Sequence, residues 1–174
     1  PRGQALVALL CGSSSGCIFV EDEPEGFDLI VNSSISQGTI VESYENGDLI
    51  SAEYVYVEFD FSSTKSDLKV IGFDLNDGSN PVEGEDVSNL KIVAEFNSHG
   101  KYNVSVYGIN SDNVKETTVI EITIDLHIEW MEDATENPTT LTIDPIPKNE
   151  GEHPLMFEIQ STVTNPSVLE DFNG

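Results

Sequence analysis

The chain has 174 residues, 38% of them hydrophobic, which is enough for one domain with a core or for two small domains. Acidic residues dominate the charge: 32 Asp and Glu stand against 7 Lys and Arg, and the formal net charge is -25. A surface this acidic repels nucleic acid and anionic lipid headgroups, so both are excluded as electrostatic partners.

Residues 1–17 are typical of the end of a secretory signal. The basic residue Arg2 precedes a seven-residue apolar run (ALVALLC, residues 5–11), and small residues follow up to Cys17. The run is too short to cross a bilayer, which needs about 20 apolar residues. The motif S-S-G-C at its end resembles a lipobox, the processing signal of lipoproteins. That resemblance implies that Cys17 carries a diacylglycerol and becomes the new N-terminus, which would anchor the chain to a membrane.

Other interpretations of this segment stay open. It also fits a plain cleaved signal, a local disulfide between Cys11 and Cys17, or the end of an upstream domain. No cysteine follows Cys17 in the sequence. The remainder of the chain therefore has no disulfide and no cysteine-based metal or redox site.

A sharp change in composition follows the signal segment. The run E-D-E-P-E-G-F-D places five acidic residues within residues 21–28. We expect residues 18–38 to form an acidic tether and a first strand.

The central part of the chain shows the period-2 alternation of β-strands, and it lacks long stretches with helical periodicity. Its apolar segments are LISAEYVYVEFDF, DLKVIGFDL, LKIVAEF, KYNVSVYGI and TVIEITIDLHIEW. Turn-forming stretches separate them: E-N-G-D, N-D-G-S-N-P, N-S-H-G and N-S-D-N. Short strands at this spacing predict an all-β protein, an antiparallel β-sandwich with one wet face on each sheet.

Residues 39–125 resemble a PKD domain, an immunoglobulin-like module. The stretch F-D-L-N-D-G, residues 73–78, stands where that family has W-D-F-G-D-G. Phe96, Gly100, Tyr102 and Val104 stand in the family's second motif, Y-x-x-x-G-x-Y-x-V. The resemblance implies an immunoglobulin-like sandwich of about seven strands.

The motif residues have structural explanations. Asp77 and Gly78 suit a turn, because the carboxylate accepts backbone N–H groups and glycine tolerates a positive φ. Tyr102 is expected to bury its ring and return its hydroxyl to the backbone, as in a tyrosine corner. The expected interior residues are Val57, Phe59, Phe73, Tyr102, Val104 and Ile122.

Residues 126–174 contain further strand-like segments: LHIEW, TTLTI and LMFEIQSTV. We interpret them as the start of a second, truncated β-sandwich module. Extra strands packed on the first domain are the alternative.

No catalytic constellation stands out in the sequence, so we expect no enzyme activity. The three histidines, His99, His127 and His153, lie in separate segments without partners at metal-ligand spacing. The loop D-L-N-D-G-S-N gives a weak calcium candidate at Asp74, Asn76 and Asp77, although the spacing is not that of an EF-hand. No other cofactor is expected.

Two sequons, at Asn32 (N-S-S) and Asn103 (N-V-S), are weak candidates for glycosylation. Asn103 falls within a predicted strand, so its use requires a solvent-facing side chain.

These features predict a non-enzymatic surface protein, held by a lipid on the outer face of a membrane or otherwise secreted. PKD-like modules act as spacers or as units that contact surface proteins or polysaccharide. Two alternatives are an N-terminal accessory part of a secreted hydrolase and a glycan-binding module. An exposed row of aromatic side chains on one sheet would favour glycan binding.

Overall fold

The structure is a computed structural model that describes residues 25–84, 87–133 and 137–163. The described residues form nine β-strands, and none of them forms a helix that could cross a membrane. In chain order the strands are β1 (Asn32–Ser33), β2 (Gln37–Glu45), β3 (Asp48–Glu53), β4 (Val55–Asp60), β5 (Leu68–Asp74), β6 (Val82–Glu83), β7 (Lys91–Phe96), β8 (Gly100–Asn110) and β9 (Lys115–Met131).

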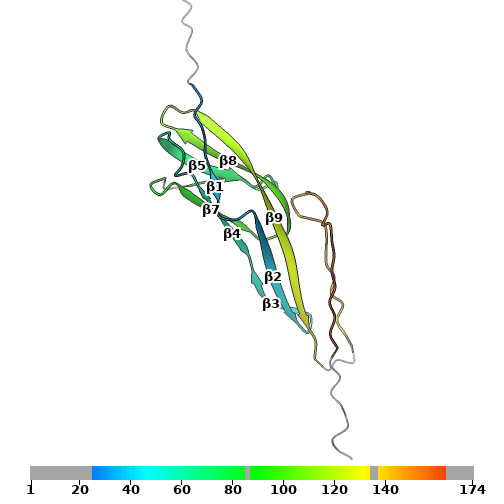
Figure 1. Cartoon of the computed structure of the whole chain (residues 1–174). Helices are drawn as coiled ribbons and strands as arrows, with labels where there is room; N and C mark the ends of the chain where they lie inside the picture. Colours follow the sequence, from blue (N-terminus) through cyan, green and yellow to red (C-terminus); the bar gives the residue numbers. More distant parts are fainter. Residues whose placement is uncertain (1–24, 85–86, 134–136, 164–174) are drawn as a thin grey trace, which may run out of the picture.

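The strands make two sheets that pack face to face (Figure 1). One sheet has the order β1-β4-β7, and the other has the order β3-β2-β9-β8-β5-β6. This architecture confirms the predicted all-β, immunoglobulin-like sandwich. Between the sheets lies one hydrophobic core, formed by Ile40, Val55, Val57, Phe59, Phe61, Leu68, Ile71, Phe73, Ile92, Ala94, Phe96, Tyr102, Val104, Val106, Ile122 and Ile124.

The alternation in the sequence explains this core. In β7 every second side chain is buried (Ile92, Ala94 and Phe96), and the residues between them are exposed, because successive side chains of a strand point to opposite faces. All six residues that were expected inside are at most 4% exposed, so that prediction is confirmed. Across the core the Phe59 and Phe73 rings meet with their centroids 5.8 Å apart.

The sandwich begins before residue 39. Phe27, Leu29 and Val31 are half-buried against the core. The Thr64 hydroxyl holds this segment, because it donates to the Ile30 carbonyl at 2.9 Å and accepts the Ile30 N–H at 3.0 Å. From Phe27 onward the predicted tether therefore belongs to the folded domain.

One strand pair is parallel, which corrects the prediction of a wholly antiparallel sandwich. The chain leaves one sheet for the other between β1 and β2. Ser34 is bonded to β4, with its N–H donating to the Glu58 carbonyl at 2.9 Å, whereas the Ser36 carbonyl accepts the Thr123 N–H of β9 at 2.9 Å. After this crossing β2 runs beside β9 in the same direction, from the pair Gln37–Thr123 to the pair Glu45–Met131.

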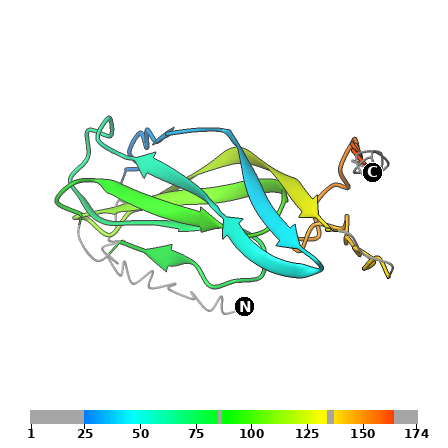
Figure 2. The ribbon, with the colours of Figure 1, turned by 90° about the horizontal axis from the view of Figure 1, so that it is seen from below.

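The six-stranded sheet extends beyond its partner sheet as a three-stranded arm. We define the arm as residues 41–45 of β2, all of β3 and residues 125–131 of β9. The sheet β1-β4-β7 starts at the Val55–Phe96 pair, and a single residue, Tyr54, separates Val55 from the end of β3. Figure 2 shows the β2–β3 hairpin and β9 reaching past the other strands at this end.

The arm moves the expected boundary at residue 125. The sequence predicts that LHIEW belongs to a second module, but this segment is part of β9. β9 continues to Met131, because β2 pairs with it from Thr123 to Met131. At the tip the Asn46-Gly47 turn, with φ values of 50° and 95°, closes the β2–β3 hairpin.

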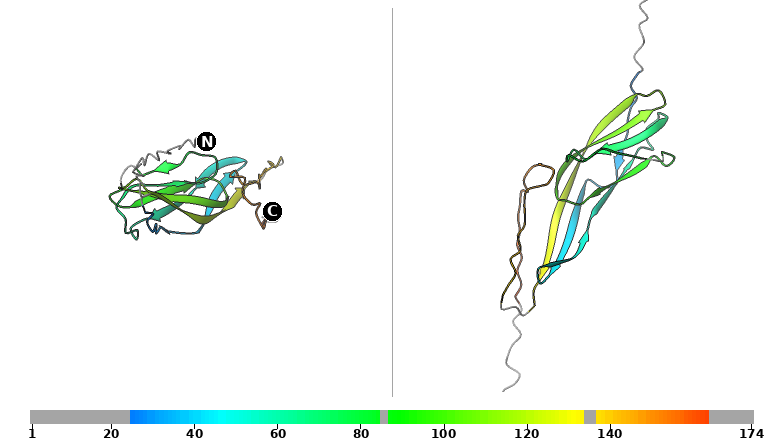
Figure 3. Two further views of the ribbon diagram at one scale, coloured as in Figure 1. Left: turned by 90° about the horizontal axis from the view of Figure 1, so that it is seen from above. Right: turned by 180° about the vertical axis from the view of Figure 1, so that it is seen from behind.

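Residues 137–163, the tail, contain no strand, so TTLTI and LMFEIQSTV do not form the predicted strands. The tail runs beside β9 as two extended legs (Figures 1 and 3). The turn between the legs contacts the start of β8: the Asn149 side-chain amide donates to the Lys101 carbonyl at 2.8 Å, and the Lys101 ammonium lies 3.2 Å from the Glu152 carboxylate.

Candidate functional site

The calcium candidate loop lies after β5 and has the geometry of a tight turn. The Asp74 carboxylate accepts the Asn76 N–H at 2.8 Å, and the Asp77 carboxylate accepts the Ser79 N–H at 3.0 Å. Asn76 and Gly78 have φ values of 55° and 87°, which short polar residues and glycine tolerate. Both carboxylates therefore cap backbone groups of the loop itself.

The Asn76 side chain points toward β8. Its amide donates to the Asn103 carbonyl at 2.6 Å and to the Ser105 hydroxyl at 2.9 Å. Burial acts to raise the pKa of Asp77, but the hydrogen bonds from Ser79 outweigh it, so this pKa lies below its ordinary value. Across the described parts of the chain, no group of three or more His, Cys, Asp or Glu residues could hold a metal ion. Calcium binding by Asp74, Asn76 and Asp77 stays a prediction.

Tyr102 makes the predicted tyrosine corner. Its hydroxyl donates to the Ser98 carbonyl at 2.9 Å and lies 2.8 Å from the Ser98 hydroxyl. The ring meets Phe96 edge to face, with the centroids 4.8 Å apart. Burial raises the pKa of this phenol. The role is structural, because the hydroxyl is used to close the loop between β7 and β8.

A second buried tyrosine, Tyr107, was not singled out in the sequence. A Cβ added to Gly72 would lie 2.6 Å from its ring, so the ring packs directly on the backbone of β5. The Lys115 ammonium lies 3.6 Å from the ring centroid, and the Tyr107 hydroxyl donates to the Glu83 carboxylate at 3.0 Å. The pKa of Tyr107 is raised to about 12, and burial is the largest cause. The hydrogen bond to Glu83 and the negative charges of Glu83 and Asp74 also contribute to this rise. A glycine inside a strand was the available signal for this close approach.

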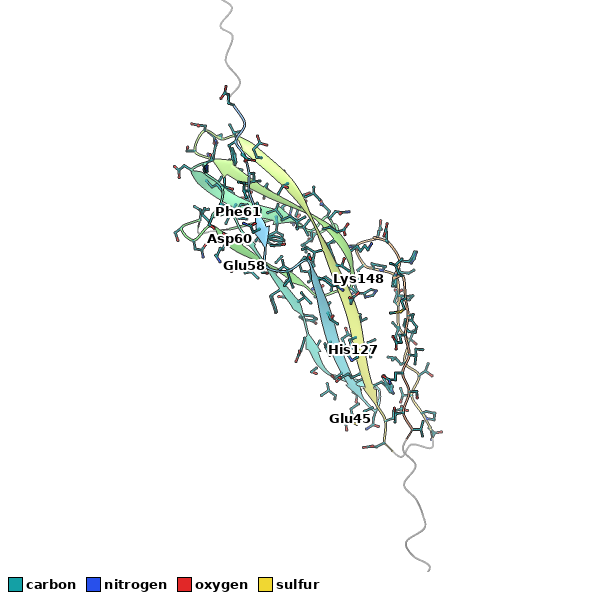
Figure 4. All side chains as sticks on the ribbon, viewed as in Figure 1. Glu45, Glu58, Asp60, Phe61, His127 and Lys148 are labelled. Atoms are coloured by element: carbon teal, nitrogen blue, oxygen red, sulfur yellow. The ribbon has the colours of Figure 1, made fainter. Side chains whose placement is uncertain are left out.

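The three histidines stay in separate places. His127 lies on the arm (Figure 4), with Nε2 3.7 Å from the Glu129 carboxylate. The ring of His99 lies 3.4 Å from the Pro145 carbonyl. His153 is exposed on the tail.

The residues predicted for modification divide into two groups. Asn103 is exposed on β8, and Asn32 is exposed on β1 with its side-chain amide 3.4 Å from the Ser63 hydroxyl. Glycosylation of either residue stays a prediction. Cys17, the predicted lipidation site, lies outside the described residues, as does Cys11.

The arm and the tail concentrate exposed apolar side chains. On the arm and just after it, Leu49 is 51% exposed, Ile50 62%, Tyr54 42% and Met131 56%. On the tail most of the exposed fractions are larger: Leu155 94%, Met156 75%, Phe157 60%, Ile159 77% and Val163 88%. A folded monomer rarely exposes an extended apolar patch without a contact function. The sequence pattern alone does not show whether such apolar segments have a covering layer.

The described residues also form two shallow hollows of about 340 Å³ each. One lies where the chain enters the sandwich, beside Phe27, Ile30 and Lys65. The other lies under the turn of the tail, beside Lys101, Glu121 and Glu152. The second hollow is mainly polar in its side chains.

No family model matches the chain, and no curated protein matches it. Among solved structures the chain is similar to one titled "Structures of Clostridium thermocellum CbhA fibronectin(III)-like modules". The two are 13% identical, the TM-score is 0.36, and the match covers 56% of this chain and 99% of the other.

Proposed function

We propose that this chain is a non-catalytic, PKD-like module that serves as a spacer or interaction unit on the outer face of a membrane, held there by a lipid on Cys17. One observation carries the contact role: exposed apolar side chains gather on the arm and the tail, away from the sandwich core. Polar side chains in the motif loops, such as Asp74 and Asp77, are meanwhile used to cap turns.

The orientation of the chain supports this role. The described chain starts at residue 25, at one end of an elongated molecule, and the tip of the arm lies at the opposite end (Figure 1). A lipid attached upstream of residue 25 would leave the arm directed away from the membrane surface. The acidic residues within 21–25, which lie between Cys17 and the folded domain in the sequence, suit a solvated tether.

The anchor is tested with the chain expressed in a host that processes lipoproteins. We expect the wild type to partition into membranes with a lipid-sized mass increment, and Cys17→Ser to lose both. Cys11→Ser is the matched control and should behave like the wild type. Membrane partitioning and modification of Cys17→Ser at the wild-type level would exclude the anchor.

Glycan binding is the second candidate, and two neighbouring tyrosines favour it. Tyr54 and Tyr56 follow one another on one side of the chain where β3 passes into β4, with exposed fractions of 42% and 58%. Exposed aromatic rings offer flat apolar surface for contact. Affinity electrophoresis through soluble polysaccharides tests this: retardation that Tyr56→Ala abolishes and Val119→Ala preserves would favour the glycan role over the spacer role.

A further inference from the structure

Two unpartnered features of the chain fit each other. The first is the outer edge of β3, the terminal strand of the six-stranded sheet. Among the described residues, β2 is the strand that pairs with β3, and no strand covers its other edge. Leu49 and Ile50 on this edge strand are more than half exposed. Such an edge is a template for the addition of another strand.

The second feature is the donor segment, residues 155–163. It forms the outgoing leg of the tail (Figure 3), and every described side chain in it is exposed. Leu155, Phe157 and Ile159 alternate with Met156, Glu158 and Gln160. In a strand this alternation places three large apolar side chains on one face.

The arm offers a matching face for those side chains. The pairing register places Tyr44 beside Trp130 and also beside Leu49, so the three share one face of the arm. The Tyr44 and Trp130 rings stack with their centroids 5.6 Å apart. This face continues the core-facing side of Ile40 beyond the end of the opposing sheet, and it includes Glu42, whose carboxylate accepts the Tyr44 hydroxyl at 2.9 Å. A strand added to β3 would extend the apolar part of this face, formed by Leu49, Tyr44 and Trp130.

The donor segment cannot make this contact where it lies in its own chain. Figures 1 and 3 both show the tail beside β9, and the sheet order β3-β2-β9 places two strands between the tail and the outer edge of β3. Pairing between the two features therefore joins different copies.

Charge favours this arrangement over pairing of β3 with itself. Two antiparallel copies of β3, centred on each other, would place Asp48 opposite Glu53 at both ends, and like charges in opposite positions destabilise a sheet. The donor segment brings one carboxylate, that of Glu158, to the same edge. We propose that the donor segment of one copy adds as a strand to the β3 edge of a second copy.

This contact is head to tail, because it joins different surfaces of the two copies. Such contacts produce rings or open chains rather than closed two-fold dimers. The net charge of -25 on each copy opposes association. Salt screens that repulsion, since the Debye length falls from about 30 Å at 0.01 M to about 10 Å at 0.1 M. Assembly should therefore increase with both protein concentration and salt.

Sedimentation of the full chain under reducing conditions tests the proposal, with Cys11 and Cys17 kept from forming disulfides. The donor variant is Phe157→Glu/Ile159→Glu, and the acceptor variant is Leu49→Glu/Ile50→Glu. The control variant is Val93→Glu/Val119→Glu, which adds the same charge at apolar residues that are 52% and 61% exposed. We expect the wild type and the control to assemble, and each of the other variants to need at least roughly tenfold higher concentration.

Mixing the two deficient variants gives the sharpest result. The acceptor variant keeps an intact donor, and the donor variant keeps an intact edge, so together they should form a 1:1 dimer that grows no further. A wild type that stays monomeric at high concentration and salt would overturn the proposal. Loss of assembly in the acceptor variant but not in the donor variant would also overturn it, because that result indicates pairing of β3 with itself. A mixture of the two variants that forms no dimer would overturn it as well. If a variant fails to fold, hydrogen exchange of the wild type decides, because assembly must protect β3 and residues 155–163 together.

Discussion

The sandwich and the arm use the same kind of strand with opposite outcomes. In the sandwich each apolar face meets a second sheet, and Val57, Phe59 and Ile122 are fully buried. In the arm the strands are also paired, with one register shift between Ser43 and Tyr44, but the opposing sheet has ended and Leu49 and Ile50 are more than half exposed. Hydrogen bonding between strands therefore sets the length of this sheet, and the second layer decides which part of it is core.

The tail carries the difference further. Residues 155–163 have the composition of a strand, but they neither pair with a described strand nor bury a side chain. An isolated β-segment is not stable without a partner edge and a covered face. Three levels of burial follow one another along the molecule: full in the sandwich, partial in the arm and almost none in the tail.

Truncation of an aromatic side chain should give the largest difference in unfolding free energy between the sandwich and the arm. Phe59→Ala removes a fully buried ring that meets Phe73, so we expect it to lower the free energy of unfolding by about 3–5 kcal/mol. Trp130→Ala on the arm removes a half-buried ring that stacks on Tyr44 and should cost less than half as much. Urea unfolding measures both. Equal losses would mean that the arm is packed as tightly as the core.

The backbone of β5 under Tyr107 should give the next largest effect. Gly72→Ala places a Cβ 2.6 Å from the Tyr107 ring and 2.8 Å from the Val82 carbonyl oxygen. Such overpacking typically costs about 1–3 kcal/mol. In a double-mutant cycle with Tyr107→Ala, part of that cost should vanish, because the ring can no longer clash. Strict additivity of the two changes would show that the ring does not press on Gly72.

A pH dependence follows from the same tyrosine. The pKa of Tyr107 is raised to about 12, chiefly by burial, so the folded state holds this proton more tightly than the unfolded state, in which a tyrosine has a pKa of about 10. The contribution is complete below pH 10 and is lost as the pH rises from 10 to 12. Urea unfolding at several pH values should show a steeper loss for the wild type than for Tyr107→Phe. Parallel curves would assign that loss to other groups.

The smallest effect should come from the attachment of the tail. Asn149→Ala removes the bond to the Lys101 carbonyl and the bond that the Asn149 side chain accepts from the Gly151 N–H at 3.1 Å. We expect the global free energy of unfolding to fall by less than about 1 kcal/mol, and proteolysis within residues 145–163 to become faster. Lys148→Ala, at the neighbouring exposed residue shown in Figure 4, is the control and should leave proteolysis unchanged. Unfolding of the sandwich together with the tail would contradict the separation of the two.

The sequence predicted the parts of the fold that depend on local pattern. Alternation placed Val104 and Ile122 inside, and the glycine and tyrosine spacing of the second motif predicted the corner at Tyr102. The arm was beyond this reasoning, because the alternation of residues 37–45 is the same whether the strand pairs in parallel or antiparallel, and it does not show where the other sheet ends. The same limit explains LHIEW, which reads as a strand in either domain.

The candidate sites divide in a similar way. The turn at Asp77 was predictable from residue chemistry, because Asp and Gly together favour such a turn. The environment of Tyr107 was not, since Gly72, Glu83 and Lys115 come from different segments and meet only in the folded sheet. The exposure of residues 155–163 was also unpredictable, because an apolar segment reads as core until its partner is known.

Hydrogen exchange of the full chain, measured at low and at high protein concentration, tests the central claim most directly. At low concentration we expect amides of β4, β7 and β8 to exchange slowly, and those of β3 and residues 155–163 to exchange faster. At high concentration protection should rise in β3 and residues 155–163 together, and little elsewhere. Slow exchange of residues 155–163 at low concentration, matching that of β8, would contradict the account, because the apolar tail would then be covered within a single chain.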